Sequence, residues 1–121
     1  MSPELRVILC DDDVSFLFLL QRMVRKAYPA AVIVAFDNGY DALVDYQQYK
    51  ADLIITDCVM PGMDGPTLAA KLREQQALIP IILISSSEHL EARALRAGAT
   101  LFFDKSTLLQ QLPQILPECV Q

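Results

Sequence analysis

The sequence lacks the features of membrane, secreted and disordered proteins. None of its apolar runs approaches the roughly 20 residues that are needed to cross a bilayer. Its first residues, Met1-Ser2-Pro3-Glu4, lack the basic segment of a secretory signal. Hydrophobic residues make up 53 % of the chain, too many for a disordered protein. We therefore expect a cytoplasmic protein without a membrane partner.

Positive charge and cysteine are also scarce. The net charge of −5 argues against direct nucleic-acid binding by this domain. The three cysteines show neither CxxC nor metal-ligand spacing, and we interpret Cys10 and Cys58 as small buried thiols. Repeats, linkers and low-complexity tracts are absent as well. Because 121 residues can bury a sizeable core, we expect residues 1–121 to form a single domain.

The chain does contain short apolar runs that end in polar or charged residues. Runs at 7–10, 53–56, 81–84 and 101–103 lead into Asp11-Asp12-Asp13, Asp57, Ser85 and Asp104-Lys105, respectively. A further run, Val32–Phe36, is followed by the turn signal Asn38-Gly39. Short continuous runs of this kind, separated by helical patterns, are typical of parallel strands covered on both faces.

Helical patterns alternate with these strands. Apolar spacing, capping residues and prolines predict helices at about 14–28, 40–49, 66–76 and 88–97. Gly98 is well placed to end the fourth of these helices. Pro113 and Pro117 are expected to interrupt a last helix that follows Lys105. The alternation predicts an α/β fold, a (βα)₅ doubly wound parallel five-stranded sheet with right-handed crossovers.

In such a sheet the carboxyl ends of the strands meet at one edge, where ligands bind. That edge would hold Asp11, Asp12 and Asp57, whose carboxylates are hard oxygen ligands suited to Mg²⁺. One carboxylate left partly free could attack phosphorus and form an aspartyl phosphate. Ser85 and Lys105 would supply a hydroxyl and an ammonium for phosphoryl oxygens. We therefore predict a site for phosphoryl transfer at this edge.

Other aspartates follow or precede the predicted strands and helices as well. We interpret Asp13, Asp64 and Asp104 as solvated loop residues or helix caps. For Asp11, Asp12 and Asp57 the same explanation is weak, since independent strands would have to end in this way by chance.

Four segments together resemble the receiver domain of two-component response regulators. They are Val7 to Asp13, Asp57 to Gly65, Pro80 to Ser85, and Gly98 to Lys105, in that order and with matching spacing. The resemblance covers essentially the whole chain. It implies the flavodoxin-like strand order 2-1-3-4-5.

The resemblance also assigns roles at the acidic edge. It implies that Asp57 is the phosphoacceptor, with a sensor histidine kinase or a histidine phosphotransfer protein as phosphodonor. Asp12, Asp57 and the backbone carbonyl of Val59 would bind Mg²⁺ directly, with Asp11 assisting through water. Ser85 and Lys105 would hold the phosphoryl oxygens. Such a domain is a signalling switch that catalyses only its own phosphorylation and dephosphorylation.

A conformational switch is implied as well. Ser85 and Phe102 occupy the positions of the family's switch residues, and the face formed by the fourth helix, fifth strand and last helix would meet an output domain or protein. A homodimer through that face is a further option.

The family commonly has proline after the lysine, in a cis peptide bond, where this chain has Ser106. Because a cis bond before a non-proline residue costs ~2.5–4 kcal/mol, we expect a trans bond there.

Two other functions rely on similar chemistry or a similar topology. One is a Mg²⁺-dependent aspartyl-phosphate phosphohydrolase, but such enzymes often carry a second aspartate two residues after the nucleophile, where this chain has Val59. The other is a flavin-binding electron carrier, in which Asp11-Asp12-Asp13 would repel the cofactor phosphate unless a metal intervened. Both are disfavoured.

Overall fold

The computed structural model describes residues 5–119, which form five strands and five helices. The strands are β1 (Arg6–Cys10), β2 (Val32–Phe36), β3 (Leu53–Asp57), β4 (Ile81–Ser85) and β5 (Leu101–Asp104). The helices are α1 (Val14–Ala27), α2 (Gly39–Tyr49), α3 (Gly65–Glu74), α4 (Glu91–Arg96) and α5 (Lys105–Cys119). A 3₁₀ turn, η1 (Glu88–Leu90), precedes α4.

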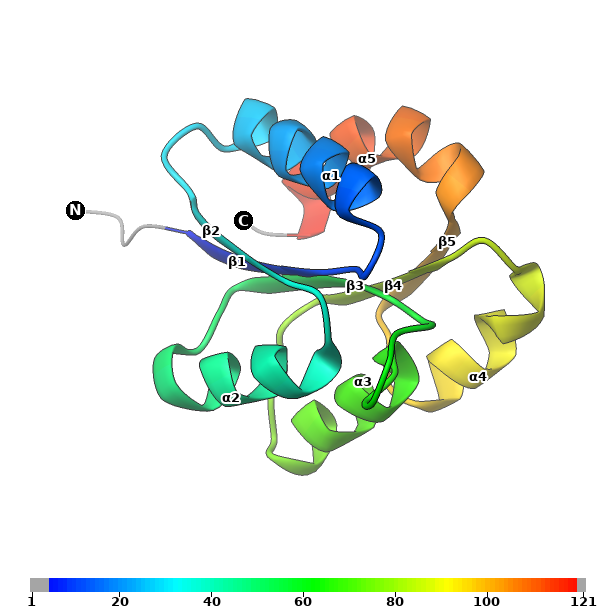
Figure 1. Cartoon of the computed structure of the whole chain (residues 1–121). Coiled ribbons are helices and arrows are strands. Elements are labelled where there is room, and N and C mark those ends of the chain that lie inside the picture. The colour runs from blue at the N-terminus through cyan, green and yellow to red at the C-terminus, as the bar shows by residue number, and fades with distance from the viewer. Residues whose placement is uncertain (1–4, 120–121) are drawn as a thin grey trace.

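All five strands are parallel and lie in the order β2-β1-β3-β4-β5. Helices α1 and α5 cover one face of the sheet, and α2, α3 and α4 cover the other (Figure 1). The predicted (βα)₅ sheet and its strand order are therefore confirmed. The order places β1 and β3 side by side in the middle, so that the ends of these two strands adjoin.

Two apolar cores flank the sheet because alternate residues of each strand point to opposite faces. On the α1/α5 side, Leu9 and Ile55 meet leucines of both helices, and on the α2/α3/α4 side Ile8 and Ile54 meet Leu68. The strands β3 and β4 are buried along their full length. This two-sided burial explains why those strands are continuous apolar runs instead of alternating ones.

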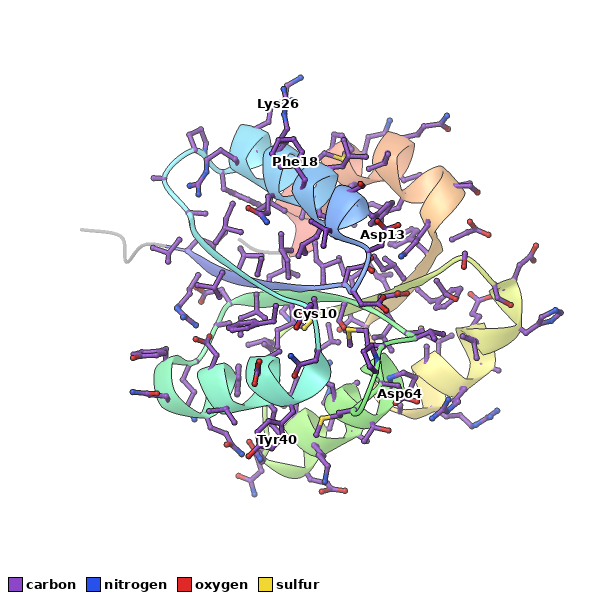
Figure 2. All side chains as sticks on the ribbon, viewed as in Figure 1. Cys10, Asp13, Phe18, Lys26, Tyr40 and Asp64 are labelled. Carbon is purple, nitrogen blue, oxygen red and sulfur yellow. The ribbon has the colours of Figure 1, made fainter. Side chains whose placement is uncertain are left out.

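The helices next to the acidic edge begin at aspartate caps. Asp13 accepts hydrogen bonds from the backbone N–H groups of Ser15 and Phe16, and Asp64 accepts one from that of Thr67. Figure 2 labels both aspartates, Asp13 where α1 begins and Asp64 where α3 begins. Asp104 similarly accepts from the backbone N–H and hydroxyl of Ser106. Of the two roles expected for these aspartates, loop residue or helix cap, the structure confirms the cap for Asp13 and Asp64.

Two predicted helices differ from the structure at their ends. The third helix ends at Glu74, two residues earlier than predicted, because Gln76 takes a positive φ of 65°. The predicted helix at 88–97 is divided into η1 and the six-residue α4, neither of which has a side-chain cap at its start. Gly98 follows α4 with φ of 111°, as predicted for its end.

The prediction that two prolines interrupt the last helix is wrong. Helix α5 runs from Lys105 to Cys119 with Pro113 and Pro117 inside it. Both prolines are exposed, so the carbonyls that lose their N–H partners can be solvated. Leucines spaced four residues apart, Leu108, Leu112 and Leu116, are fully buried in the α1/α5 core. Their burial holds the helix together across the prolines.

The peptide bond between Lys105 and Ser106 is trans, as predicted, and residues 5–119 contain no cis peptide bond. Strand β5 leads into α5 without an intervening loop, because Asp104 is the last strand residue and Lys105 the first helical one. Among the helices of the described chain, none has the length and apolar character that a membrane span requires.

Candidate functional site

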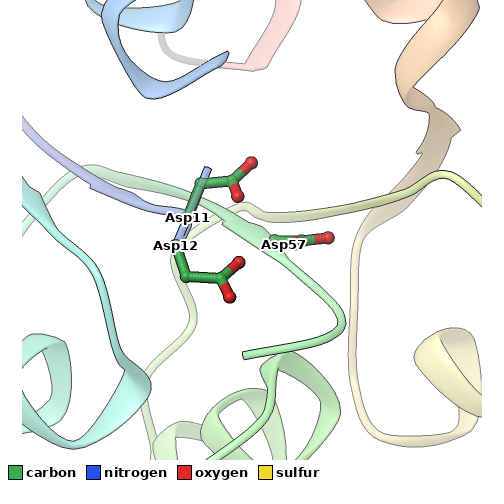
Figure 3. A group of neighbouring side chains, drawn as sticks. All are labelled: Asp11, Asp12 and Asp57. Carbon is green, nitrogen blue, oxygen red and sulfur yellow. The ribbon is translucent and has the colours of Figure 1, made fainter. Parts of the chain in front are cut away.

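Three carboxylates meet where β1 and β3 end. Asp11 and Asp12 follow β1, and Asp57 is the last residue of β3. The two strands are paired with Cys10 opposite Thr56, so the next residues along each strand, Asp11 and Asp57, are neighbours. One ligand oxygen from each of the three aspartates lies within 4.8 Å of the others (Figure 3). The structure therefore brings together the carboxylates that the sequence analysis selected.

The local backbone holds these aspartates in different environments. The N–H of Asp11 donates to the carbonyl of Phe36 at 3.0 Å, and its carboxylate accepts from the N–H of Asp13 at 2.9 Å. Asp11 is fully buried and Asp57 is nearly so, whereas Asp12 is exposed. A cation could therefore reach the cluster from the side of Asp12.

Lys105 brings a positive charge to the cluster from the end of β5. Its Nζ lies 2.8 Å from Oδ2 of Asp11 and 3.4 Å from Oδ2 of Asp57. Burial alone would favour the neutral amine, but the carboxylates of Asp11 and Asp57 outweigh it and raise the pKa of Lys105. The side chain is therefore an ammonium at neutral pH.

The environment of Asp57 disfavours its ionised form. Burial, followed by the negative charge of Asp11, raises the pKa of Asp57 to about 6. Lys105 and a hydrogen bond from the backbone N–H of Val59 act in the opposite direction. The carboxylate is still ionised at neutral pH, so that it can act as a nucleophile without a separate base.

The cluster has more negative charge than Lys105 can balance. Three carboxylates face one ammonium, and Lys105 is already shared between Asp11 and Asp57. Three carboxylates this close together repel one another, and a bound cation would relieve that repulsion. Within residues 5–119 this is also the one acidic group with metal-binding geometry. The donors are all oxygens, which fits Mg²⁺ better than a thiolate-seeking metal.

Ser85 and Val59 lie at the same edge. Ser85 is the buried last residue of β4, the strand beside β3, and its Oγ accepts a hydrogen bond from the N–H of Ser87 at 3.0 Å. Val59 follows Asp57 by two residues and its side chain is 62 % exposed. An exposed valine beside a carboxylate offers no polar side-chain atom to orient water.

Phe102 lies on β5, at a distance from the carboxylates. It is paired with Leu83 of β4 and packs, half-buried, against the α2/α3/α4 core. A groove of about 460 Å³ passes over it, with Glu88, Glu91 and Asp104 among its lining residues. The aromatic ring is therefore placed between the core and the surface formed by α4, β5 and α5.

Sequence reasoning did not single out Arg93 as a link between elements. Its guanidinium donates to Oδ2 of Asp64 at 2.9 Å and thereby ties α4 to the start of α3. Burial acts to raise the pKa of Asp64, but the Thr67 hydrogen bonds and this contact outweigh it and lower that pKa. No sequence motif marks such a pair, because the partners are far apart in the chain and meet only through the fold.

The two cysteines near the site are poorly reactive thiols. Cys10 and Cys58 are buried free thiols, and burial raises the pKa of each to about 12. A thiol with so high a pKa is protonated at neutral pH and is a poor nucleophile. The interpretation of both residues as small buried thiols is confirmed.

Known proteins are similar to this chain over most of its length. A family model described as the response regulator receiver domain matches residues 7–117. The transcriptional regulatory protein RprY of Bacteroides fragilis is 31 % identical over 115 residues, which are 93 % of this chain and 48 % of that protein. The two-component response regulator ARR3 of Arabidopsis thaliana is 29 % identical over 129 residues, covering 94 % of this chain and 55 % of that protein. The chain thus spans about half the length of these two relatives.

Solved structures show the same architecture. The chemotaxis protein CheY4 of Vibrio cholerae superposes with a TM-score of 0.84 at 23 % identity. The match covers 98 % of this chain and all of that one, and at this identity it shows a shared fold.

Proposed function

This chain belongs to the response regulator receiver domain family of two-component systems, and from the geometry of its acidic edge we propose that Asp57 is the phosphoacceptor of a phosphorylation-dependent switch. The observation that carries the proposal is the buried Asp57 carboxylate, which ends β3 beside Asp11 and within 3.4 Å of the Lys105 ammonium. Residues 1–121 would act as a single receiver domain.

The acidic cluster fits a divalent cation, for which we propose Mg²⁺. Asp12, Asp57 and the backbone carbonyl of Val59 would bind it directly, with Asp11 assisting through water. The convergence of three carboxylates and their excess negative charge support this assignment. Bound there, Mg²⁺ would neutralise the carboxylates and polarise the oxygens of the incoming phosphoryl group.

In the proposed reaction a carboxylate oxygen of Asp57 attacks the phosphorus of a phosphohistidine. An O–P bond forms, the P–N bond breaks, and the leaving imidazole takes its electron pair and a proton from solvent. Lys105 would donate to a phosphoryl oxygen with its ammonium, and Ser85 with its hydroxyl. Ser85 ends β4 and Lys105 follows β5, and both strands lie on the same side of β3 in the sheet order, which supports these roles.

The phosphodonor would be a sensor histidine kinase or a histidine phosphotransfer protein. We propose that the surface of α4, β5 and α5 passes the signal to an output domain or protein, with Ser85 and Phe102 as the switch residues. Phe102 supports this because it lies between the core and that surface. The chain would catalyse only its own phosphorylation and dephosphorylation.

Intact-mass spectrometry with phosphoramidate as donor tests the phosphoacceptor. We expect the wild-type chain to gain one phosphoryl group in the presence of Mg²⁺, and little or none after chelation, because the carboxylates then repel the anionic donor. Asp57→Asn should remain unlabelled under both conditions.

The matched control is Asp64→Asn, which removes the carboxylate that caps α3 and leaves the cluster intact. This variant should be labelled like wild type. Labelling of Asp57→Asn to the wild-type extent would place the phosphoryl group on another residue and refute the proposal.

A further inference from the structure

We propose that Phe16 is a positioning residue for phosphoryl transfer, whose ring holds the Lys105 ammonium over the acidic edge. The Nζ atom of Lys105 lies over the ring of Phe16, 4.7 Å from its centroid. The inference rests on the proposed function, since it matters for phosphoryl transfer only if Lys105 binds the phosphoryl group.

The ammonium of Lys105 has three partners from three parts of the fold. Asp11 after β1 contacts it at 2.8 Å, Asp57 at the end of β3 at 3.4 Å, and the Phe16 ring covers it from α1. The side chain of Lys105 is only 17 % exposed, so the ammonium has lost much of its water. A cation–π contact is stronger under such partial desolvation than on an open surface.

The position of the ring is set by the start of α1. The N–H of Phe16 donates to the Asp13 cap at 3.2 Å, which anchors the residue in the first turn of the helix. The half-buried side chain also packs against the α1/α5 core. The helix cap and the core contacts therefore fix the ring in place, so that the ring restrains the flexible Lys105 side chain.

The ring differs from the two carboxylates in what happens when a cation enters the cluster. Asp11 and Asp57 attract Lys105 by charge, and a cation bound to the same oxygens competes for them and repels the ammonium. The attraction to the ring comes from its quadrupole and does not depend on those oxygens. Phe16 would thus keep Lys105 at the edge when the carboxylates are engaged.

Simple core packing is the alternative role for Phe16, and substitutions separate the two. Phe16→Leu keeps an apolar side chain and removes the ring face, whereas Phe16→Tyr keeps the face. Phe18, two residues along the same helix, is the matched control: its ring is exposed and lies 5.9 Å from Arg22 on α1. Phe18→Leu removes a phenylalanine from α1 without touching the acidic edge.

The first measurement is NMR of the lysine side chains in the metal-free protein. A ring over the ammonium should shift the ε-methylene protons of Lys105 upfield of those of the exposed Lys71. Phe16→Leu should abolish that shift, while Phe16→Tyr and Phe18→Leu should preserve it. A wild-type Lys105 without an upfield shift would overturn the proposal even if Phe16→Leu failed to fold.

The second measurement is the rate of phosphoramidate labelling with saturating Mg²⁺. We expect Phe16→Leu to slow labelling about two- to tenfold, the range of a partly desolvated cation–π contact. Phe16→Tyr and Phe18→Leu should both be labelled at the wild-type rate. In a Lys105→Met background, Phe16→Leu should cause no further slowing.

The outcomes distinguish the inference from the function on which it rests. If Lys105→Met slows labelling and Phe16→Leu does not, the role of Phe16 is refuted and the proposed function stands. If Lys105→Met is labelled as fast as wild type, the proposed role of Lys105 fails and that of Phe16 with it. An equal decrease of the labelling rate in Phe16→Tyr and Phe16→Leu would mean that Phe16 contributes only core packing.

Discussion

The aspartates of this chain differ in function because their backbone surroundings differ. Asp13 and Asp64 face the free N–H groups of helix starts, which satisfy their carboxylates. Asp57 is instead buried beside Asp11, and its pKa is raised to about 6 for that reason. At the residue scale, the ionised carboxylates of the site therefore repel one another, and a bound cation or a proton would remove that repulsion.

Because of this repulsion, we expect Asp57→Asn to stabilise the metal-free protein at pH 7. The pKa of Asp57 rises from 3.8 to about 6 on folding, so folding stability falls as the pH increases through this window and stays low above it. The asparagine avoids that loss, and we expect a gain of ~1–2 kcal/mol in the free energy of unfolding at pH 7. The gain should largely vanish at pH 4.

Urea unfolding of both proteins at pH 7 and pH 4, without divalent ions, measures this difference. Asp37→Asn, a change at an exposed aspartate, is the control and should shift the free energy of unfolding by less than about 0.5 kcal/mol. A gain that is as large at pH 4 as at pH 7 would contradict an origin in ionisation.

At the scale of the element, α5 shows how packing overrides local preference. Pro113 and Pro117 each remove a backbone donor, yet the helix continues because Leu108, Leu112 and Leu116 are buried on its inner side. The hydroxyl of Tyr28 also donates to the carbonyl of Leu116. The helix is thus held from the sheet side and is weakened on its outer side.

Replacing either proline should therefore stabilise the protein. Pro113→Ala restores an N–H that can reach the carbonyl of Leu109, and we expect the free energy of unfolding to rise by ~1–3 kcal/mol. Thermal and urea unfolding followed by circular dichroism would measure it. Gln110→Ala, on the exposed side of the same helix, should change stability little. A destabilised Pro113→Ala would show that the proline ring packs usefully in place.

At the scale of the whole molecule, the acidic edge is connected to the α4, β5 and α5 surface. Ser85 accepts a hydrogen bond from the N–H of Ser87, which directly precedes η1, and Arg93 ties α4 to Asp64. A shift of Ser85 toward a phosphoryl group would therefore reach α4 over a short path. Phe102, half-buried beneath that surface, could then move inward.

We accordingly expect beryllofluoride with Mg²⁺ to perturb NMR shifts across residues 88–110. A new charge-assisted hydrogen bond to Ser85 is worth about 1.5–3 kcal/mol, enough to tilt a two-state equilibrium. Ser85→Ala should still be phosphorylated, more slowly, and should transmit little change to that segment. Thr67→Ala, a change on α3, is the control and should show the same shift changes across residues 88–110 as the wild-type chain. Perturbations confined to the acidic edge in the wild-type chain would refute this route of signalling.

The sequence by itself determined the strands, their order along the chain and the carboxylates at their ends. Period and composition suffice for that, because parallel strands buried on both faces must be continuous apolar runs. Asp11, Asp57, Ser85 and Lys105 follow directly from those runs, since the residues at the carboxyl end of each strand, or just after it, must lie at the shared edge. Residues at such an edge need no knowledge of packing to be found.

Only the tertiary structure decided how the helices end and which distant side chains meet. The continuity of α5 depends on leucines that face α1, and the pairs Arg93–Asp64 and Phe16–Lys105 join elements far apart in the chain. Helical periodicity marks Phe16 as an apolar residue of α1 and nothing more. The reason is physical: local preference and period act over a few residues, whereas these contacts exist only once the sheet has brought the helices together.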